Sequence, residues 1–254
     1  GHQEGVRPGE HPESRQSCIG GKMKNSIIER VRRENPGLVI HEMEEPLFKE
    51  YGELISLPDV QKIEAIAEKE TVMPETGNKY VASIHALETD SLIEACKPFF
   101  GGMPVQIGYC NGHGNHLGGM EWHLCPEGTI CLTEGVFFLG RQTGMDSFHF
   151  DTKNAVAFFA EKGMCFLLHP MTLHLAPSQV TKEGFRSIII LEKGTNTPLD
   201  DATKQIIHAS DSLEFKTLFM KNKWMIAHES NQRLIERGVL PLVSGVDYEV
   251  HPII

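Results

Sequence analysis

The sequence predicts a mainly β domain built as a small barrel or jelly roll. Its 24 glycines and 14 prolines are spread through many short apolar runs, as in a chain that turns often. From Met103 onward, about eight strand-like runs follow within about ninety residues, separated by Gly, Pro, Asn or Asp. The runs are MPVQIGY, GMEWHL, TICLT, GVFFLG, NAVAFFAE, MCFLL, TLHLAP and FRSIIILE. Strands this short and closely spaced favour a closed barrel over a helical bundle.

The elements before the barrel form an α/β preamble. Residues 1–22 are polar and rich in Gly and Pro, so we expect a disordered leader or a non-native remnant, with Met23 as a natural start. Helical spacing predicts helices over Met23–Arg33 and Asp59–Glu68, and a first strand over Leu38–His41. The run YVASIHAL then alternates like a strand, and TDSLIEACKPF has a Thr cap and helical spacing.

The C-terminal part changes character from Pro198 onward. LDDATKQII and HESNQRLIER predict helices, and the aromatic segment LFMKNKWMIAH lies between them. No internal repeat separates the chain into parts. We therefore expect one domain over 23–254, with a barrel core over about 101–197 and a helical extension over 198–254.

Composition excludes several classes of protein. The 254 residues are 40% hydrophobic and 23% charged, unlike a disordered or fibrous chain. The net charge of −10, without a local basic stripe, disfavours nucleic acid as a partner. No apolar run approaches the ~20 residues that cross a bilayer, and no signal-peptide core is present, so we expect a soluble cytoplasmic protein. The six cysteines form no CxxC pair, and we expect reduced thiols.

Histidines concentrate where the barrel is predicted, and two of them have carboxylates at suggestive spacing. Glu121 and His123 are two residues apart, so a strand would put both on one face. Glu127 follows a Pro bend and could return to the same point. His174, on a strand-like run after another Pro turn, could supply a ligand from a distance. Imidazole and carboxylate are common metal ligands, so this group predicts a metal site.

These segments resemble the cupin superfamily. The spacing E-x-H-x3-E is similar to the first cupin motif, H-x-H-x3-E, with Glu121 in place of the first histidine, and P-x-T-L-H ending at His174 is similar to the second. GGMPVQIGYCNG (101–112), TLHLAP and EKGTN resemble a bacterial cupin family of unassigned function, ureidoglycolate hydrolase-like and associated with carbohydrate metabolism. The resemblance implies a cupin double-stranded β-helix, a jelly-roll barrel, and pairing through outer strands as a homodimer.

The resemblance also implies a divalent metal bound by Glu121, His123, Glu127 and His174. Two carboxylates and two imidazoles favour Mn²⁺, Fe²⁺, Ni²⁺ or Zn²⁺ over copper. The substitution of Glu for the first histidine leaves an alternative open. Glu121 could act as an acid or base, which would leave three ligands.

Five further residues are candidates for catalysis or substrate binding. Lys193 follows the run SIIILE and could bind a substrate oxygen, or it is a solvated strand end. His149 could be a general base at the barrel mouth, although a turn between strands is the plainer interpretation. Arg141 ends a strand in a similar place. Lys223 and Trp224 combine a cation with a ring suited to stacking on a sugar, or they form a dimer contact.

A metal held by four side chains in an octahedral arrangement keeps two open positions. A hydroxyl and a carbonyl on neighbouring carbons of an open-chain sugar could occupy them, and the carbonyl would be polarised. The sequence therefore predicts a metal-dependent isomerase or epimerase that acts on a small sugar through an enediolate. The alternatives are a lyase or hydrolase for a small ureido or keto acid, with Lys193 or Arg141 binding the anion, and a non-catalytic sugar-binding cupin.

Overall fold

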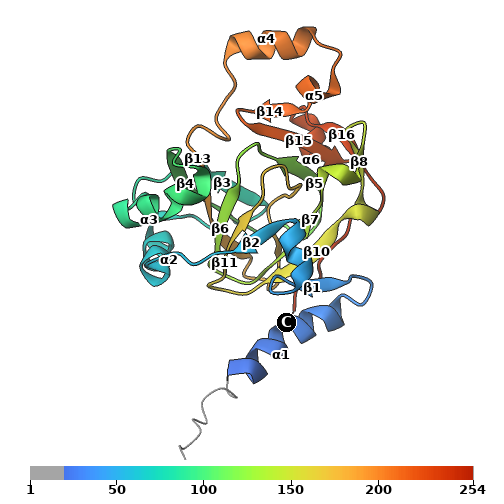
Figure 1. The fold of residues 1–254 in the computed structure, drawn as a ribbon. Helices are drawn as coiled ribbons and strands as arrows, with labels where there is room; N and C mark the ends of the chain where they lie inside the picture. The colour runs from blue at the N-terminus through green and yellow to red at the C-terminus, as the bar shows by residue number, and fades with distance from the viewer. Residues whose placement is uncertain (1–19, 254) are drawn as a thin grey trace, which may run out of the picture.

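The computed structural model describes residues 20–253, and side chains from residue 27 onward. Most of the predicted leader (1–22) therefore lies outside the described residues. The first helix, α1 (Gly20–Glu34), contains the predicted segment 23–33 and ends at the NPG sequence. Its Ile28 and Val31 are buried against the barrel, beside which α1 lies in Figure 1.

One wall of the barrel is a six-stranded sheet in the order β2-β11-β6-β13-β4-β3. Its strands are β2 (Gly52–Leu54), β3 (Asn78–Val81), β4 (Val105–Gly112), β6 (Glu127–Cys131), β11 (Cys165–Leu168) and β13 (Phe185–Glu192). β13 is antiparallel to both β4 and β6, with Ile188 opposite Tyr109 and Ile130. The β-branched run FRSIIILE suits this central, fully paired position.

The second wall is the four-stranded sheet β1-β10-β7-β12, continued by single backbone bridges. Its strands are β1 (Ile40–Glu42), β7 (Gly135–Leu139), β10 (Val156–Ala160) and β12 (Ser178–Gln179). Leu173 pairs with Gly140, and His174 pairs with Glu121 on β5 (Gly119–Trp122). The segment leading into β12 therefore lies between β7 and β5.

Successive barrel strands alternate between these two walls, except that β7 and β10 are antiparallel neighbours in the second wall. β4, β6, β11 and β13 belong to the first wall, whereas β5, β7, β10 and β12 belong to the second. This alternation is the double-stranded β-helix of cupins, so the predicted fold class is confirmed. Seven of the eight predicted runs contain a strand, and TLHLAP joins the wall through bridges instead.

The α/β preamble covers the outer face of the first wall, beside β3 and β4 (Figure 1). It contains α2 (Val60–Glu70) and α3 (Asp90–Cys96), which Thr89 caps through a hydrogen bond from the Leu92 amide. Ile63 of α2 and Leu92 of α3 pack with Ile188 and other outward residues of the sheet. The alternate residues of the wall are thereby free to face the barrel interior.

The C-terminal extension is only partly helical, which corrects the expectation for 198–254. Its elements are α4 (Asp201–Ala209), α5 (Leu213–Lys216), β14 (Leu218–Met220), β15 (Lys223–His228), α6 (Gln232–Glu236) and β16 (Leu240–Ser244). The aromatic segment between the predicted helices forms the β14–β15 hairpin, and β15 pairs with β5. An open edge at β5 needs a strand partner, and the alternating KWMIAH run supplies it.

The remaining short elements complete the sheets. β8 (Met145–Asp146) and β9 (His149–Asp151) form a hairpin whose second strand pairs with β16. Single 3-10 turns occur at η1 (Pro46–Glu50), η2 (Lys97–Phe100), η3 (Gln142–Gly144) and η4 (Thr152–Asn154). Within residues 20–253, the helices are too short or too polar to cross a membrane.

Candidate metal centre

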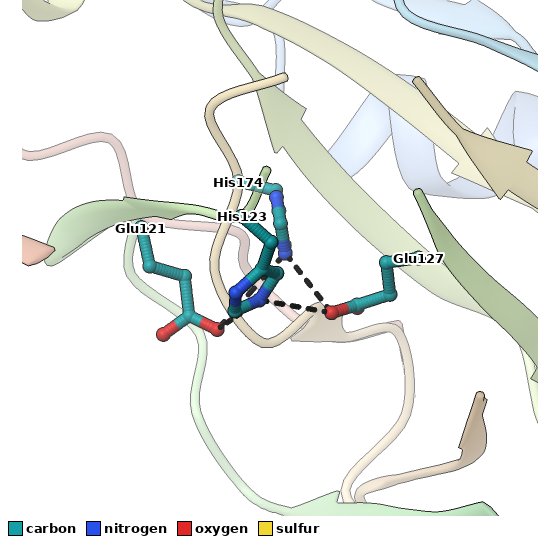
Figure 2. Close-up of side chains that lie close together, drawn as sticks. All are labelled: Glu121, His123, Glu127 and His174. Carbon is teal, nitrogen blue, oxygen red and sulfur yellow. Dashed lines mark hydrogen bonds and ion pairs between the residues drawn. The ribbon is translucent and has the colours of Figure 1, made fainter. Parts of the chain in front are cut away.

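Four predicted ligands meet inside the barrel. Glu121 lies on β5, His123 directly follows this strand, Glu127 opens β6, and His174 lies on the segment paired with β5. One ligand atom from each residue lies within 4.8 Å of the others, and all four residues are buried. Figure 2 shows the two imidazole rings lying between the two carboxylates.

Backbone pairing fixes the distance between the two cupin-like segments. The Glu121 amide donates to the His174 carbonyl at 2.6 Å, and the His174 amide donates to the Glu121 carbonyl at 2.9 Å. Glu121 and His123 then share a face because they are two residues apart on an extended chain. These side chains converge in the structure, as the sequence predicts.

Both histidines are oriented by backbone carbonyls. His123 Nδ1 lies 2.7 Å from the Asn222 carbonyl, and His174 Nδ1 lies 2.8 Å from the Thr172 carbonyl. A carbonyl only accepts, so each Nδ1 carries the proton and each Nε2 is directed at the cluster. Asn222 lies in the turn between β14 and β15 with a φ of 53°, and its side chain accepts from the Leu124 amide at 2.9 Å.

Glu127 lies closer to the two imidazole rings than Glu121 does. Glu127 Oε2 is 3.3 Å from Nε2 of both His123 and His174. Glu121 Oε1 is farther from the same two atoms, at 3.8 and 4.0 Å. The two carboxylates are therefore not equivalent.

The donor set fits a divalent metal ion. His123 Nε2 is buried and has no hydrogen-bond partner among the described residues. Such an orphaned nitrogen beside buried carboxylates is costly unless a cation satisfies it. Nitrogen and oxygen donors of this kind suit Mn²⁺, Fe²⁺, Ni²⁺ or Zn²⁺, and the sequence did not discriminate among them.

The metal-free cluster holds protons that a metal would displace. Burial alone would lower the pKa of His174, but the Glu127 carboxylate, supported by Glu121, raises it to about 9. Burial alone would raise the pKa of Glu127, but the His174 and His123 imidazoles hold it well below its usual range. Metal binding here is therefore coupled to proton release.

Lys223 joins the cluster from β15. Its Nζ lies 2.5 Å from Glu121 Oε2 and 5.8 Å from the centroid of the Tyr80 ring. The sequence predicted Lys223 as a substrate-binding residue, and the structure places it at the site. Tyr80, on β3, was missed because nothing in its strand pattern indicates that it reaches this cavity.

The cluster forms one end of a cavity of about 220 Å³. Apolar side chains from both walls and from β15 surround the buried end: Phe137, Leu168, Ile189 and Met225. The exposed residues Arg233 and Arg237, from α6 and the position after it, line the same cavity at its outer end. The buried His–Glu cluster is thus connected to a basic opening.

Trp224, predicted to stack on a sugar or to form a dimer contact, does not line this cavity. β15 alternates, so Lys223 and Met225 face the cavity whereas Trp224 faces the other side. There its Nε1 donates to the Glu214 carbonyl at 3.1 Å, and its ring lines a separate hollow with Trp122. Lys223 and Trp224, which were predicted to act together, therefore lie on opposite faces of β15.

Three other predicted residues do not reach the cavity. Lys193 is exposed in the turn after β13, and its amide donates to the Pro104 carbonyl. His149 is exposed on β9, with Nδ1 3.1 Å from the Ser147 carbonyl. Arg141 is exposed and forms an ion pair with Glu50. A strand end alone did not indicate whether the following side chain faces the cavity or the solvent.

The comparisons with known proteins give a family. A family model described as Domain of unknown function (DUF4867) matches residues 40–247. The chain belongs to the DUF4867 family. The matched range begins at β1, ends beyond β16 and includes all four cluster residues. A search of curated proteins gives no match for this DUF4867 chain.

Solved structures that the DUF4867 chain resembles include three at low similarity. A cupin domain from Bordetella pertussis Tohama I has 13% identity and a TM-score of 0.28, covering 48% of this chain and 99% of that one. A tryptophan-to-phenylalanine variant of Bacillus subtilis oxalate decarboxylase has 10% identity and a TM-score of 0.33, and the match covers 71% of this chain and 45% of that one. The coconut allergen cocosin has 12% identity and a TM-score of 0.31, and the match covers 54% of this chain and 30% of that one. The DUF4867 chain thus spans less than half the length of the last two.

Proposed function

We propose that this DUF4867 chain is a metal-dependent isomerase or epimerase that acts on a small sugar or sugar derivative. The observation that carries the proposal is the position of Glu121. One of its oxygens faces the His–Glu cluster and the other binds Lys223 at 2.5 Å, inside the cavity. A carboxylate placed between a metal centre and a cation suits proton transfer next to a polarised carbonyl.

His123, Glu127 and His174 would hold the metal. When bound, a divalent metal supplies a Lewis acid that polarises a substrate carbonyl and acidifies the neighbouring C–H. Glu121 Oε1, the more distant carboxylate oxygen, would carry the proton between the two carbons. Lys223 would keep the Glu121 carboxylate in place by binding Oε2.

Tyr80 supplies a hydroxyl donor for the substrate. Its oxygen accepts from Asn196 Nδ2 at 2.9 Å, which leaves its own proton available. The residue as a whole is 37% exposed, yet burial raises the pKa of Tyr80, and the Asn196 amide offsets this only in part. The phenol stays protonated and could donate to a sugar hydroxyl, while the apolar walls would limit water near the reacting carbons.

The decisive experiment is solvent exchange. The metal-loaded protein is incubated with a panel of aldoses and ketoses in D₂O, and deuterium next to the carbonyl is measured by NMR. We expect exchange with at least one sugar, loss of exchange in Lys223→Ala, and retention in the exposed control Lys193→Ala. Absence of exchange for every sugar would overturn the isomerase proposal.

Two alternatives keep specific support. A lyase or hydrolase for a small ureido or keto acid needs cations near the anion, and the cavity provides Lys223, Arg233 and Arg237 rather than the predicted Lys193 or Arg141. A non-catalytic sugar-binding cupin would use the same cavity without turnover. Tight sugar binding without exchange or product would favour that module.

We also propose a cytoplasmic homodimer. The cysteines within the described range are free and buried, as suits a reducing compartment, and the exposed edge strand β3 offers a surface for pairing. Light scattering on the purified protein checks the assembly, and a monomer at micromolar concentration would contradict it.

A further inference from the structure

Two arginines share the cavity with the metal cluster. Arg233 lies on α6, and Arg237 lies four residues later, directly after the helix ends. Residues four apart on a helix lie on the same side, so the two guanidinium groups open toward one space. Both residues are exposed, whereas Glu121 and Glu127 at the other end are buried.

Neither arginine forms an ion pair with a carboxylate of the described chain. The Arg237 guanidinium instead lies over the Phe219 ring, 5.3 Å from its centroid. Arg233 lies against Gly77, which has a φ of 67°, and a Cβ at Gly77 would be 2.4 Å from Arg233 Nη1. The missing side chain of Gly77 thus makes room for this guanidinium.

The helix that carries the arginines is fixed to the barrel. Asn231 caps α6 by accepting from the Leu234 amide, and its Nδ2 donates to the Gly118 carbonyl at 2.9 Å. Leu234 is buried beneath the helix. The backbone that carries the guanidinium groups is therefore held in place at the cavity opening, which lowers the entropic cost of binding an anion.

The charges of the cavity call for an anion of more than one charge. Glu121 and Glu127 would neutralise a divalent metal, and Lys223 is paired with Glu121. This leaves Arg233 and Arg237 as two positive charges that have no carboxylate partner among the described residues, in a chain whose net charge is −10. A dianion bound by two guanidinium forks matches these two charges better than a neutral sugar or a single carboxylate does.

We propose that Arg233 and Arg237 bind a phosphate monoester, so that the substrate is a sugar phosphate. Its carbonyl end would face the metal cluster, and its phosphate would lie at the opening of the cavity. The sugar part of this inference rests on the proposed function, whereas the phosphate site rests on the two arginines and the cavity.

Calorimetric titration of the metal-loaded full chain tests the site. The probes are inorganic phosphate, a set of hexose 6-phosphates, the matching free hexoses and the matching hexuronates. We expect the phosphate esters to bind more tightly than the free sugars. Affinity should fall about tenfold in Arg233→Gln or Arg237→Gln and about a hundredfold in the double variant, because each loses a charge-assisted hydrogen bond. Arg33→Gln, an exposed arginine on α1, is the matched control and should bind like the parent.

Three results would overturn the phosphate site. The first is that neither phosphate nor any ester binds. The second is that the parent and the double variant bind the esters equally tightly. The third is that the hexuronates bind as tightly as the esters. A folded double variant is verified by its unchanged metal content. Arginine-dependent phosphate binding without solvent exchange for any sugar would reject the isomerase while supporting the anion site, so the two proposals fail separately.

Discussion

The two faces of the β5–β15 strand pair carry side chains of different chemistry on one shared backbone. The inner face carries Glu121 and Lys223, which form an ion pair beside the His–Glu cluster. The outer face carries Trp122 and Trp224, which are paired in register and line a separate hollow. Adjacent residues on one strand thus serve metal binding or packing according to parity alone. Substitutions on the two faces should therefore have different kinds of effect.

The largest expected effect is loss of the metal from the inner face. In His123→Ala, the cluster loses a buried nitrogen ligand, and metal content should fall from about one ion per chain to near zero. Elemental analysis of protein purified without chelator measures this. His149→Ala, an exposed histidine, is the control and should retain its metal. Unchanged metal in His123→Ala would remove the cluster from consideration as a metal centre.

The next effect separates the two carboxylates. Glu121→Gln keeps a hydrogen-bond acceptor for Lys223 but cannot carry a proton. We expect metal content to be retained and solvent exchange to fall by about 10²–10⁴-fold, the usual contribution of an acid–base group. Glu50→Gln, an exposed carboxylate, should change neither quantity. If Glu121→Gln loses its metal together with exchange, Glu121 is a fourth ligand instead.

The outer face should control stability. Trp122 is 2% exposed and belongs to the largest core cluster, so Trp122→Ala should lower the free energy of unfolding by about 3–5 kcal/mol. Urea unfolding measures the change. Trp224→Ala, at a half-buried position, should cost clearly less. Equal costs at the two positions would contradict the packing difference described here.

Changing the pH should distinguish the metal-free from the metal-loaded inner face. Because the pKa of His174 is raised to about 9, its pairing with Glu127 stabilises the metal-free fold fully below the unfolded value near 6.5. This stabilisation should decrease as the pH rises from about 6.5 to 9, by roughly 1–3 kcal/mol. Calorimetry should show a falling Tm without metal. With metal, proton competition weakens over the same range, so a parallel fall would contradict the coupling.

The smallest effects are expected at two positions that the strand pattern suggested and that do not line the cavity. Lys193→Ala and Arg141→Ala should leave solvent exchange within about twofold of the parent, since both side chains are exposed away from the cavity. Initial-rate measurements with the best sugar are sufficient. A large loss in either variant would place that residue at the substrate after all.

Glu121, His123 and Glu127 could be predicted because they lie close together in the sequence, and His174 because its segment resembles the second cupin motif. Glu121 and His123 share a face by strand parity, and Pro turns place Glu127 and His174 near them. Tyr80, Arg233 and Arg237 could not be predicted, because they reach the cavity only through the pairing of β3 with β4 and of β15 with β5. Long-range pairing of this kind leaves no periodic signal in the residues it brings together.

The fold was predictable in the same uneven way. The barrel strands follow from short β-branched and aromatic runs between turn residues, and they lie where the pattern indicated. The C-terminal hairpin was missed because LFMKNKWMIAH lies between two segments with helical spacing. Its strand character comes from the open edge of β5, which the local sequence does not reveal.

The carbonyl of Asn222 orients His123 through a hydrogen bond that spans 99 positions along the chain. During synthesis the four ligands leave the ribosome well before this hairpin does. An emerging barrel therefore contains every ligand before it contains the group that sets the ring of His123. The ring of His123 is therefore held in place only after β15 has paired with β5, so the orientation of this ligand depends on the last part of the chain to be synthesised.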